Sequence, residues 1–191
     1  MQQPDFSKQS ARDIIKAEFV GMYKSLPLNH ISVSSLSTAC NMSRGTFYLY
    51  FKDVRALYRE CEYDLINHMD KELPEVVLCT VATDYEKYVA AFHGLLRCII
   101  EKLDDYKCFL NGSEEASFRQ AWFESIRKHF IQSIVFSRSI SPEQHDYFTR
   151  FFAGGTYTVL NYWILNDCRE PAEDIANASA QILFKGAFLA K

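Results

Sequence analysis

Side chains that can bind phosphate groups and base edges are concentrated between positions 43 and 52, in the order Ser-Arg-Gly-Thr-Phe-Tyr-Leu-Tyr-Phe-Lys. Threonine and tyrosine hydroxyls can donate hydrogen bonds to phosphate oxygens, and Arg44 can donate two hydrogen bonds to O6 and N7 of guanine. Lys52 adds a cation at the other end of the segment. Residues of these types at this spacing indicate contact with nucleic acid.

The surrounding sequence predicts two short helices joined by a tight turn. Ser32 is expected to cap the first helix, in which apolar residues recur at helical spacing. Asn41 tolerates a left-handed backbone better than most residues, which favours a sharp reversal. Ser43 is expected to cap the second helix, residues 44–51. A helix, a short turn and a second helix form the motif that places its second helix in the major groove of DNA.

The second predicted helix has two different faces. Phe47 and Phe51 lie one turn apart, where they can dock on the preceding helix. A glycine inside a helix costs about 1 kcal/mol relative to alanine, so close approach to another surface would explain Gly45. The alternative is that the aromatic residues of this helix simply belong to the core. The face opposite the two phenylalanines carries Gly45, Thr46 and Leu49, flanked by Tyr48 and Tyr50.

Residues 41–52 resemble the helix-turn-helix of TetR/AcrR-type transcriptional regulators, which typically ends in Gly-Val-Ser-Lys-Gly-Thr-Phe/Leu-Tyr-x-His/Tyr-Phe-Lys. This chain reads Asn-Met-Ser-Arg-Gly-Thr-Phe-Tyr-Leu-Tyr-Phe-Lys at these positions. It departs at Asn41, which replaces the usual turn glycine, and at Val54, where a phosphate-binding lysine is common. The two alternatives at Val54 are that this anchor is missing and that Arg55 supplies it. The resemblance implies a double-stranded DNA partner and the DNA-binding residues Ser32, Ser34, Ser43, Arg44, Gly45, Thr46, Tyr48, Leu49, Tyr50 and Lys52.

Charge is distributed unevenly along the chain, whose formal net charge is −3. Residues 1–60 contain eight Lys or Arg and five Asp or Glu, a net charge of +3. The remainder contains thirteen basic and nineteen acidic residues, a net charge of −6. A basic N-terminal segment on an acidic body favours local contact with DNA.

Composition also predicts the cellular location. No apolar run reaches the roughly 18 residues of a membrane-spanning helix, and the N-terminus lacks the pattern of a signal peptide. The six cysteines are scattered and form no CxxC pair, which favours reduced thiols over a disulfide framework. We therefore expect a cytoplasmic protein without a membrane partner.

Helical periodicity continues to the C-terminus, so the sequence predicts an all-α fold of about nine helices. Residues 1–53 are expected to form a three-helix helix-turn-helix domain and residues 54–191 a helical bundle, to which the family resemblance assigns effector binding and dimerisation. Ser113 is expected to cap a new helix after a turn, and Ser141 is expected to begin another with a capping box. Outside the helix-turn-helix, helices are expected at residues 8–25, 54–72, 84–102, 105–110, 114–135 and 142–166, and from residue 171 onward.

Three C-terminal runs are similar to one TetR-type subgroup, which includes regulators related to those of dihydroxyacetone metabolism. They are Phe-Phe-Ala-Gly-Gly at 151–155, Asn-Tyr-Trp-Ile-Leu-Asn at 161–166 and Glu-Pro-Ala-Glu-Asp-Ile-Ala at 170–176. The last two helices form the dimer interface in this family, so the resemblance implies a homodimer whose two heads, about 34 Å apart, match a palindromic operator. The alternative is that the small residues pack within one protomer. The interface candidates are Gly154, Gly155, Tyr162, Ala176, Ser179 and Leu183.

The family resemblance also implies a small-molecule effector, of unknown identity, among the helices of the bundle. His93 and Arg97 are one helical turn apart and can orient a polar or anionic ligand, while Trp122, Phe123 and Tyr157 can supply apolar walls. The alternatives are that the aromatic residues belong to the core and that His93 and Arg97 lie on a solvated face.

Motifs for catalysis are absent from the sequence: it contains no HExxH, GxSxG, P-loop or GxGxxG. Asp64 and His68 have the spacing of two metal ligands, but the sequence offers no third, and His129 and His145 are expected on solvated faces. We therefore expect no enzyme activity, cofactor or metal. The family resemblance favours a repressor; the alternative is an activator or a protein-binding adaptor.

Overall fold

The computed structural model describes residues 8–72, 84–133 and 141–185. Within these residues there are nine α-helices, one short 3-10 helix and no strand, which confirms the predicted all-α fold. The helix ends that fall inside these ranges lie within two residues of the predicted ends, whereas the end predicted at residue 135 lies outside them. The elements are α1 (Lys8–Tyr23), η1 (Leu28–His30), α2 (Val33–Ala39), α3 (Arg44–Tyr50), α4 (Val54–Glu72), α6 (Tyr85–Glu101), α7 (Leu103–Asn111), α8 (Glu115–Ser133), α9 (Pro142–Leu165) and α10 (Ala172–Lys185).

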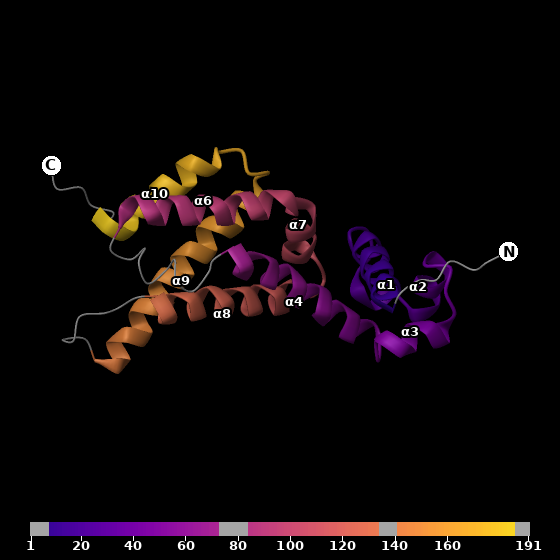
Figure 1. Cartoon of the computed structure of the whole chain (residues 1–191). Coiled ribbons are helices and arrows are strands. Elements are labelled where there is room, and N and C mark those ends of the chain that lie inside the picture. Colours follow the sequence, from indigo (N-terminus) through magenta and orange to yellow (C-terminus); the bar gives the residue numbers. More distant parts are fainter. Residues whose placement is uncertain (1–7, 73–83, 134–140, 186–191) are drawn as a thin grey trace.

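Helix α4 connects the two parts of the molecule. Figure 1 shows α1, α2 and α3 gathered at one end as a head, while α6 to α10 form a bundle at the other. α4 packs against α1 in the head and against α6, α7 and α8 in the bundle, where α10 packs on α6 and α9 on α8. No helix in the described ranges has both the length and the apolar character to cross a lipid bilayer.

Local hydrogen bonds form the helix-turn-helix as predicted. The Ser32 hydroxyl accepts a hydrogen bond from the Ser35 amide at 3.0 Å, and the Ser43 hydroxyl accepts one from the Thr46 amide at 3.0 Å. Each satisfies an amide that has no partner inside its helix. Asn41 has a φ of 50°, in the left-handed region, and so reverses the chain between α2 and α3.

The apolar core continues from the head into the bundle without a break. Phe47 and Phe51 are buried beneath α3, as predicted, in the same cluster as Trp122 and Trp163 of the bundle. Neighbouring aromatic rings link the two parts, with centroids 5.3 to 5.8 Å apart. In order from α1 to α9, these rings belong to Phe19, Tyr23, Tyr58, Phe109, Phe118, Trp122 and Tyr157.

The turn between α7 and α8 docks directly on the head. The Tyr23 hydroxyl accepts a hydrogen bond from the Glu114 amide at 3.2 Å, and the Leu28 amide donates to the Ser113 hydroxyl at 3.0 Å. A Cβ on Gly112 would lie 2.2 Å from the Tyr23 oxygen, so only glycine fits here. The prediction that Ser113 caps α8 was wrong: Glu114 precedes the helix, and Ser113 binds the head instead.

Candidate nucleic-acid interface

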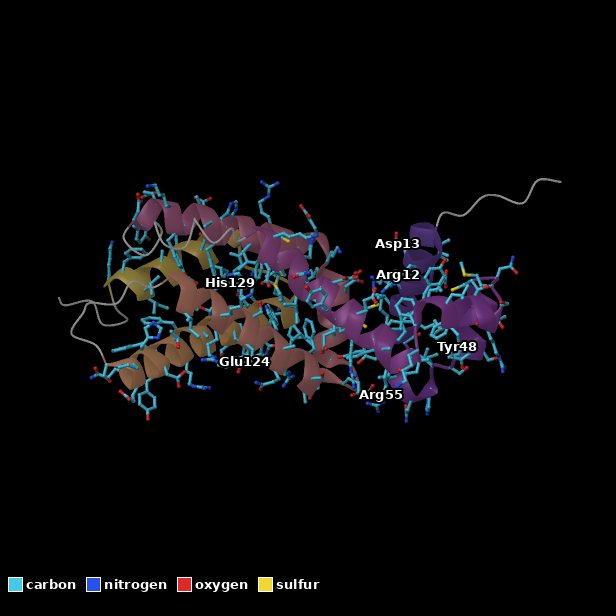
Figure 2. The ribbon with its side chains drawn as sticks, turned by 60° about the horizontal axis from the view of Figure 1, so that its bottom comes forward. Arg12, Asp13, Tyr48, Arg55, Glu124 and His129 are labelled. Atoms are coloured by element: carbon cyan, nitrogen blue, oxygen red, sulfur yellow. The ribbon has the colours of Figure 1, made fainter. Side chains whose placement is uncertain are left out.

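Helix α3 presents an exposed outer face at the end of the molecule. Phe47 is only 1% exposed, whereas the adjacent Tyr48 and Leu49 are 58% and 80% exposed. Figure 2 labels Tyr48 at the head end, far from His129 in the bundle. The prediction that one side of this helix packs inward and the other stays open is therefore confirmed.

Arg44 joins the first turn of α3 to the first turn of α2. Its Nη2 donates a hydrogen bond to the Ser34 hydroxyl at 2.7 Å, and both residues are exposed. Lys52 is exposed just after the helix. Arg55, which can replace the lysine common at position 54, has a side chain that is 68% exposed and lies 3.7 Å from Glu114. Three cationic side chains are thus accessible on or beside α3.

The predicted hydroxyl groups lie at the starts of α2 and α3. Ser32 and Ser43 serve as N-caps, and the Ser43 and Thr46 hydroxyls are 2.9 Å apart. Thr46 and Tyr50 are half-buried, so they offer less surface than Tyr48. Because all these groups lie on α2, α3 or their caps, the structure brings the predicted residues onto one small part of the head.

Packing inside the described part of the chain does not explain Gly45. A Cβ at this position would meet a single neighbour within 4 Å, the Ser43 hydroxyl, at an ordinary contact distance of 3.5 Å. Alanine would therefore fit here and would favour the helix by about 1 kcal/mol. The contrast with Gly112 indicates that any requirement for a bare backbone at Gly45 comes from outside the described part of the chain.

Acidic side chains of α4, where it packs against the head, form ion pairs with basic side chains of α1. Glu60 accepts a hydrogen bond from Arg12 Nε at 2.7 Å and pairs with Lys16, which also lies 2.7 Å from Asp64. Burial raises the pKa of Glu60, but the hydrogen bonds from Arg12 and Lys16 outweigh it and hold that pKa below its ordinary value. The carboxylates of Glu60 and Asp64 therefore add little net negative charge to the surface formed by α1 and α4.

The predicted effector residues lie on α6, α8 and α9 of the bundle and differ in burial. Trp122 is buried in the core, while Arg97 is exposed on α6 and His93 is half-buried. Tyr157 packs edge-on against Trp122 with ring centroids 5.5 Å apart. The buried Tyr157 hydroxyl has no hydrogen-bond partner within the described part of the chain. Phe123 is half-buried and lies 4.0 Å from the position of a Cβ on Gly154.

Two adjoining apolar cavities lie elsewhere in the bundle, with volumes of about 140 and 50 Å³. They share Tyr88, Phe130 and Thr156, and the smaller one extends between α6 and α8. Sequence reasoning missed these residues because cavity walls and filled core carry the same apolar pattern. The other lining residues are Phe151, Phe152, Gly155, Val159, Ser179, Ile182 and Leu183 in the larger cavity, and Phe92, Leu95, Ile126 and His129 in the smaller.

His129 borders the smaller cavity and pairs with a carboxylate. Its Nε2 lies 2.9 Å from Asp70, which also accepts a hydrogen bond from Ser125 at 2.7 Å. Burial raises the pKa of Asp70, yet the hydrogen bonds from His129 and Ser125 hold it below its usual value. The expectation of a solvated face for His129 was therefore wrong. In the three described segments, no group of His, Cys, Asp and Glu can hold a metal ion.

The predicted dimer residues divide between the core and the surface. Ala176 is fully buried within the chain, and Gly154 lies against Phe123, as the alternative of internal packing expects. Tyr162 is exposed on α9, and Gly155 has open space around it. Ser179 and Leu183 line the larger cavity. The sequence did not identify the other exposed apolar residues on these two helices: Tyr147, Phe148, Phe151, Val159 and Ile182.

Comparison with known proteins gives matches along most of the chain. Residues 86–185, just over half of the chain, match a TetR-type family model described as "Transcriptional regulator C-terminal region". The "Uncharacterized HTH-type transcriptional regulator YxbF" of Bacillus subtilis (strain 168) is 20% identical over 168 residues, covering 88% of this chain. The chain spans only 43% of the length of that curated relative.

Solved structures share the fold at low sequence identity. "Dihydroxyacetone kinase operon activator DhaS" has a TM-score of 0.62 and 16% identity, covering 92% of this chain and 94% of that one. The "fatty acid degradation regulator FadR from Bacillus halodurans" has a TM-score of 0.60 and 15% identity, covering 98% of each chain. Both similarities extend over the head and the bundle, because they cover nearly the whole chain.

Proposed function

Because the chain belongs to the TetR family of transcriptional regulators, we propose that it binds double-stranded DNA as a homodimer and represses transcription from the bound site. The observation that carries this proposal is the outer face of α3, where Tyr48 and Leu49 are exposed in the middle of a helix-turn-helix. A helix so placed, with Arg44 at its start and Lys52 just after it, can enter the major groove.

Each polar group on or just after α3 has a distinct role in this proposal, and so does Gly45. Arg44 reads a guanine through its two parallel donors, and its bond to Ser34 holds it at the surface in the free protein. Lys52 and the hydroxyls of Tyr48 and Thr46 bind phosphate groups, which fixes the register of the helix on the duplex. Gly45 lets the helix backbone come close to the DNA.

Dimerisation is supported by the exposed apolar face of α9 and α10. Phe151 is 73% exposed, and Tyr147, Tyr162 and Ile182 are also exposed on these helices. Exposed apolar surface of this extent marks an interaction site, and a second copy of the same face covers it with two-fold symmetry. Two heads related in this way match an inverted repeat with half-sites about one DNA turn apart.

Repression is the expected direction of regulation, because a dimer bound over a promoter blocks access to it. We expect a reporter gene downstream of the operator to be expressed less when the protein is present. An Arg44→Ala, Lys52→Ala double variant serves as the control, since it keeps the fold and loses the DNA contacts. Higher expression with the wild-type protein would contradict repression and favour activation, the role that the name of the DhaS protein gives to that relative.

The effector site that we propose is the pair of apolar cavities around Thr156. Their walls are almost wholly apolar, so the ligand they favour carries an apolar group of about the size of benzene, which an apolar cavity of about 150 Å³ can hold. Helices α6, α8, α9 and α10 supply these walls, and α6 and α8 also contact α4. A ligand here can therefore shift the helix that carries the head, provided it prefers one conformation of the dimer.

Filling the cavity is expected to abolish the effector response. In a thermal-shift panel of phenols, medium-chain alcohols and small polar acids, we expect apolar members to raise the melting temperature of the wild type. At 100 times the dissociation constant the rise is about 5–10 °C. Thr156→Leu should lose this rise because its larger side chain occupies the cavity, while Arg97→Ala, on the exposed side of α6, keeps it. A panel without any shift would indicate a regulator that has no effector of this class.

A further inference from the structure

Leu49 is the most exposed large apolar side chain within the described part of the chain, at 80%. It lies in the middle of α3, one turn after Gly45, on a surface whose other groups are mainly hydroxyls and cations. An aliphatic side chain can form neither a hydrogen bond nor an ion pair. Its contribution to binding must therefore come from removing apolar surface from water.

The major groove of DNA offers one apolar group, the C5-methyl group of thymine. Guanine, cytosine and adenine carry no methyl group there and are distinguished by their hydrogen-bonding atoms. Gly45 lies one helical turn before Leu49 on the same side of α3. Because Gly45 has no side chain, it leaves Leu49 uncovered on that side. We propose that Leu49 reads the methyl group of a thymine in each half-site, an inference that rests on the proposed DNA-binding function.

The neighbouring Tyr48 is held for a different contact. Its ring packs edge-on against Phe47, with centroids 5.6 Å apart and an interplanar angle of 86°. This contact fixes the ring beside the helix and leaves the hydroxyl as its free end, a group that suits a phosphate oxygen. Leu49, at 80% exposed, keeps most of its surface available to pack on a base edge.

The test uses an operator selected by the wild-type protein from a random duplex pool. Each thymine is replaced by uracil, which lacks only the methyl group, at symmetric positions in both half-sites. At one position we expect wild-type binding to weaken about fourfold per half-site, or roughly 15-fold for the two together, as burial of one methyl group predicts. Leu49→Ala should bind the thymine and uracil duplexes with equal affinity.

Two control variants separate reading of the methyl group from general effects. Lys52→Ala should bind both duplexes more weakly, because it removes a phosphate contact. The ratio of its affinity for the thymine duplex to its affinity for the uracil duplex should equal that of the wild type. Leu26→Ala should bind as the wild type does, since Leu26 is an exposed leucine in the head outside α3. Uracil changes only the DNA, so the wild-type result stands whether or not any variant folds.

The inference fails if no uracil replacement weakens wild-type binding. It also fails if Leu49→Ala discriminates between the thymine and uracil duplexes as strongly as the wild type does. If Tyr48→Ala bound the thymine and uracil duplexes equally while Leu49→Ala still discriminated between them, the methyl contact would belong to Tyr48 and the inference would be overturned. A selected operator that tolerates uracil everywhere contradicts only this inference. Failure to select any duplex would contradict the proposed function itself.

Discussion

Replacing Phe151 by aspartate is expected to convert the protein into a monomer that no longer binds its operator with measurable specificity. Phe151 is 73% exposed on α9, so the change leaves the core of the protomer intact. In a two-fold interface the new carboxylate occurs twice, and burying an unpaired charge costs about 3–5 kcal/mol. Sedimentation at micromolar concentration should give the 22.1 kDa mass of one chain, against twice that mass for the wild type.

Tyr63→Asp is the matched control for this variant. Tyr63 is an aromatic residue of comparable exposure, but it lies on α4 rather than on α9 or α10. This variant should stay dimeric and bind the operator as the wild type does. A Phe151→Asp protein that remains dimeric would place the interface on another surface, and a monomeric wild type would remove the dimer from the proposal.

Replacing Arg44 by alanine is expected to relax sequence discrimination at one or two base pairs of each half-site by about 1–3 kcal/mol. The Arg44 guanidinium is exposed at the start of α3 and can form two parallel hydrogen bonds with guanine. Lys52→Ala should instead weaken binding to all sequences and reduce the salt slope by about one. Fluorescence anisotropy across a series of operator variants and salt concentrations measures both effects.

Arg169→Ala provides the control for loss of an exposed arginine. Arg169 lies between α9 and α10, outside the head, so its replacement should change neither discrimination nor the salt slope. If Arg44→Ala and Lys52→Ala both bind as tightly and as selectively as the wild type, α3 does not contact DNA in the proposed way.

The helix-turn-helix could be predicted because its signals act over a few residues. Ser32 and Ser43 each cap a helix by accepting a hydrogen bond from the amide three residues later. Asn41 reverses the chain because its own φ lies in the left-handed region. The one-turn spacing of Phe47 and Phe51 determines which side of α3 is buried. None of these features depends on the position of a distant segment.

Contacts between distant segments could not be predicted in the same way. Ser113 binds Leu28 across 85 positions of the sequence, and a serine after a glycine is equally suited to cap the next helix. His129 meets Asp70 across 59 positions of the sequence, a separation at which helical spacing cannot reveal the pair.

The candidate dimer face could be predicted only in part. Small and aromatic residues alternate around α9 and α10, and the rotation of each helix against its neighbours decides which of them stay outside. Ala176 lies in the core, whereas Tyr162 lies at the surface. Phe151 shows the limit most clearly, because its sequence pattern fits a core residue and its side chain is exposed.

Selection of duplexes from a random pool by the wild-type protein tests the central claim most directly. The account predicts an enriched inverted repeat whose half-sites lie about 34 Å apart, one turn of DNA, and no enrichment by the Arg44→Ala, Lys52→Ala double variant. A pool that stays random at low salt, or enrichment that persists in the double variant, would contradict recognition of DNA by α3.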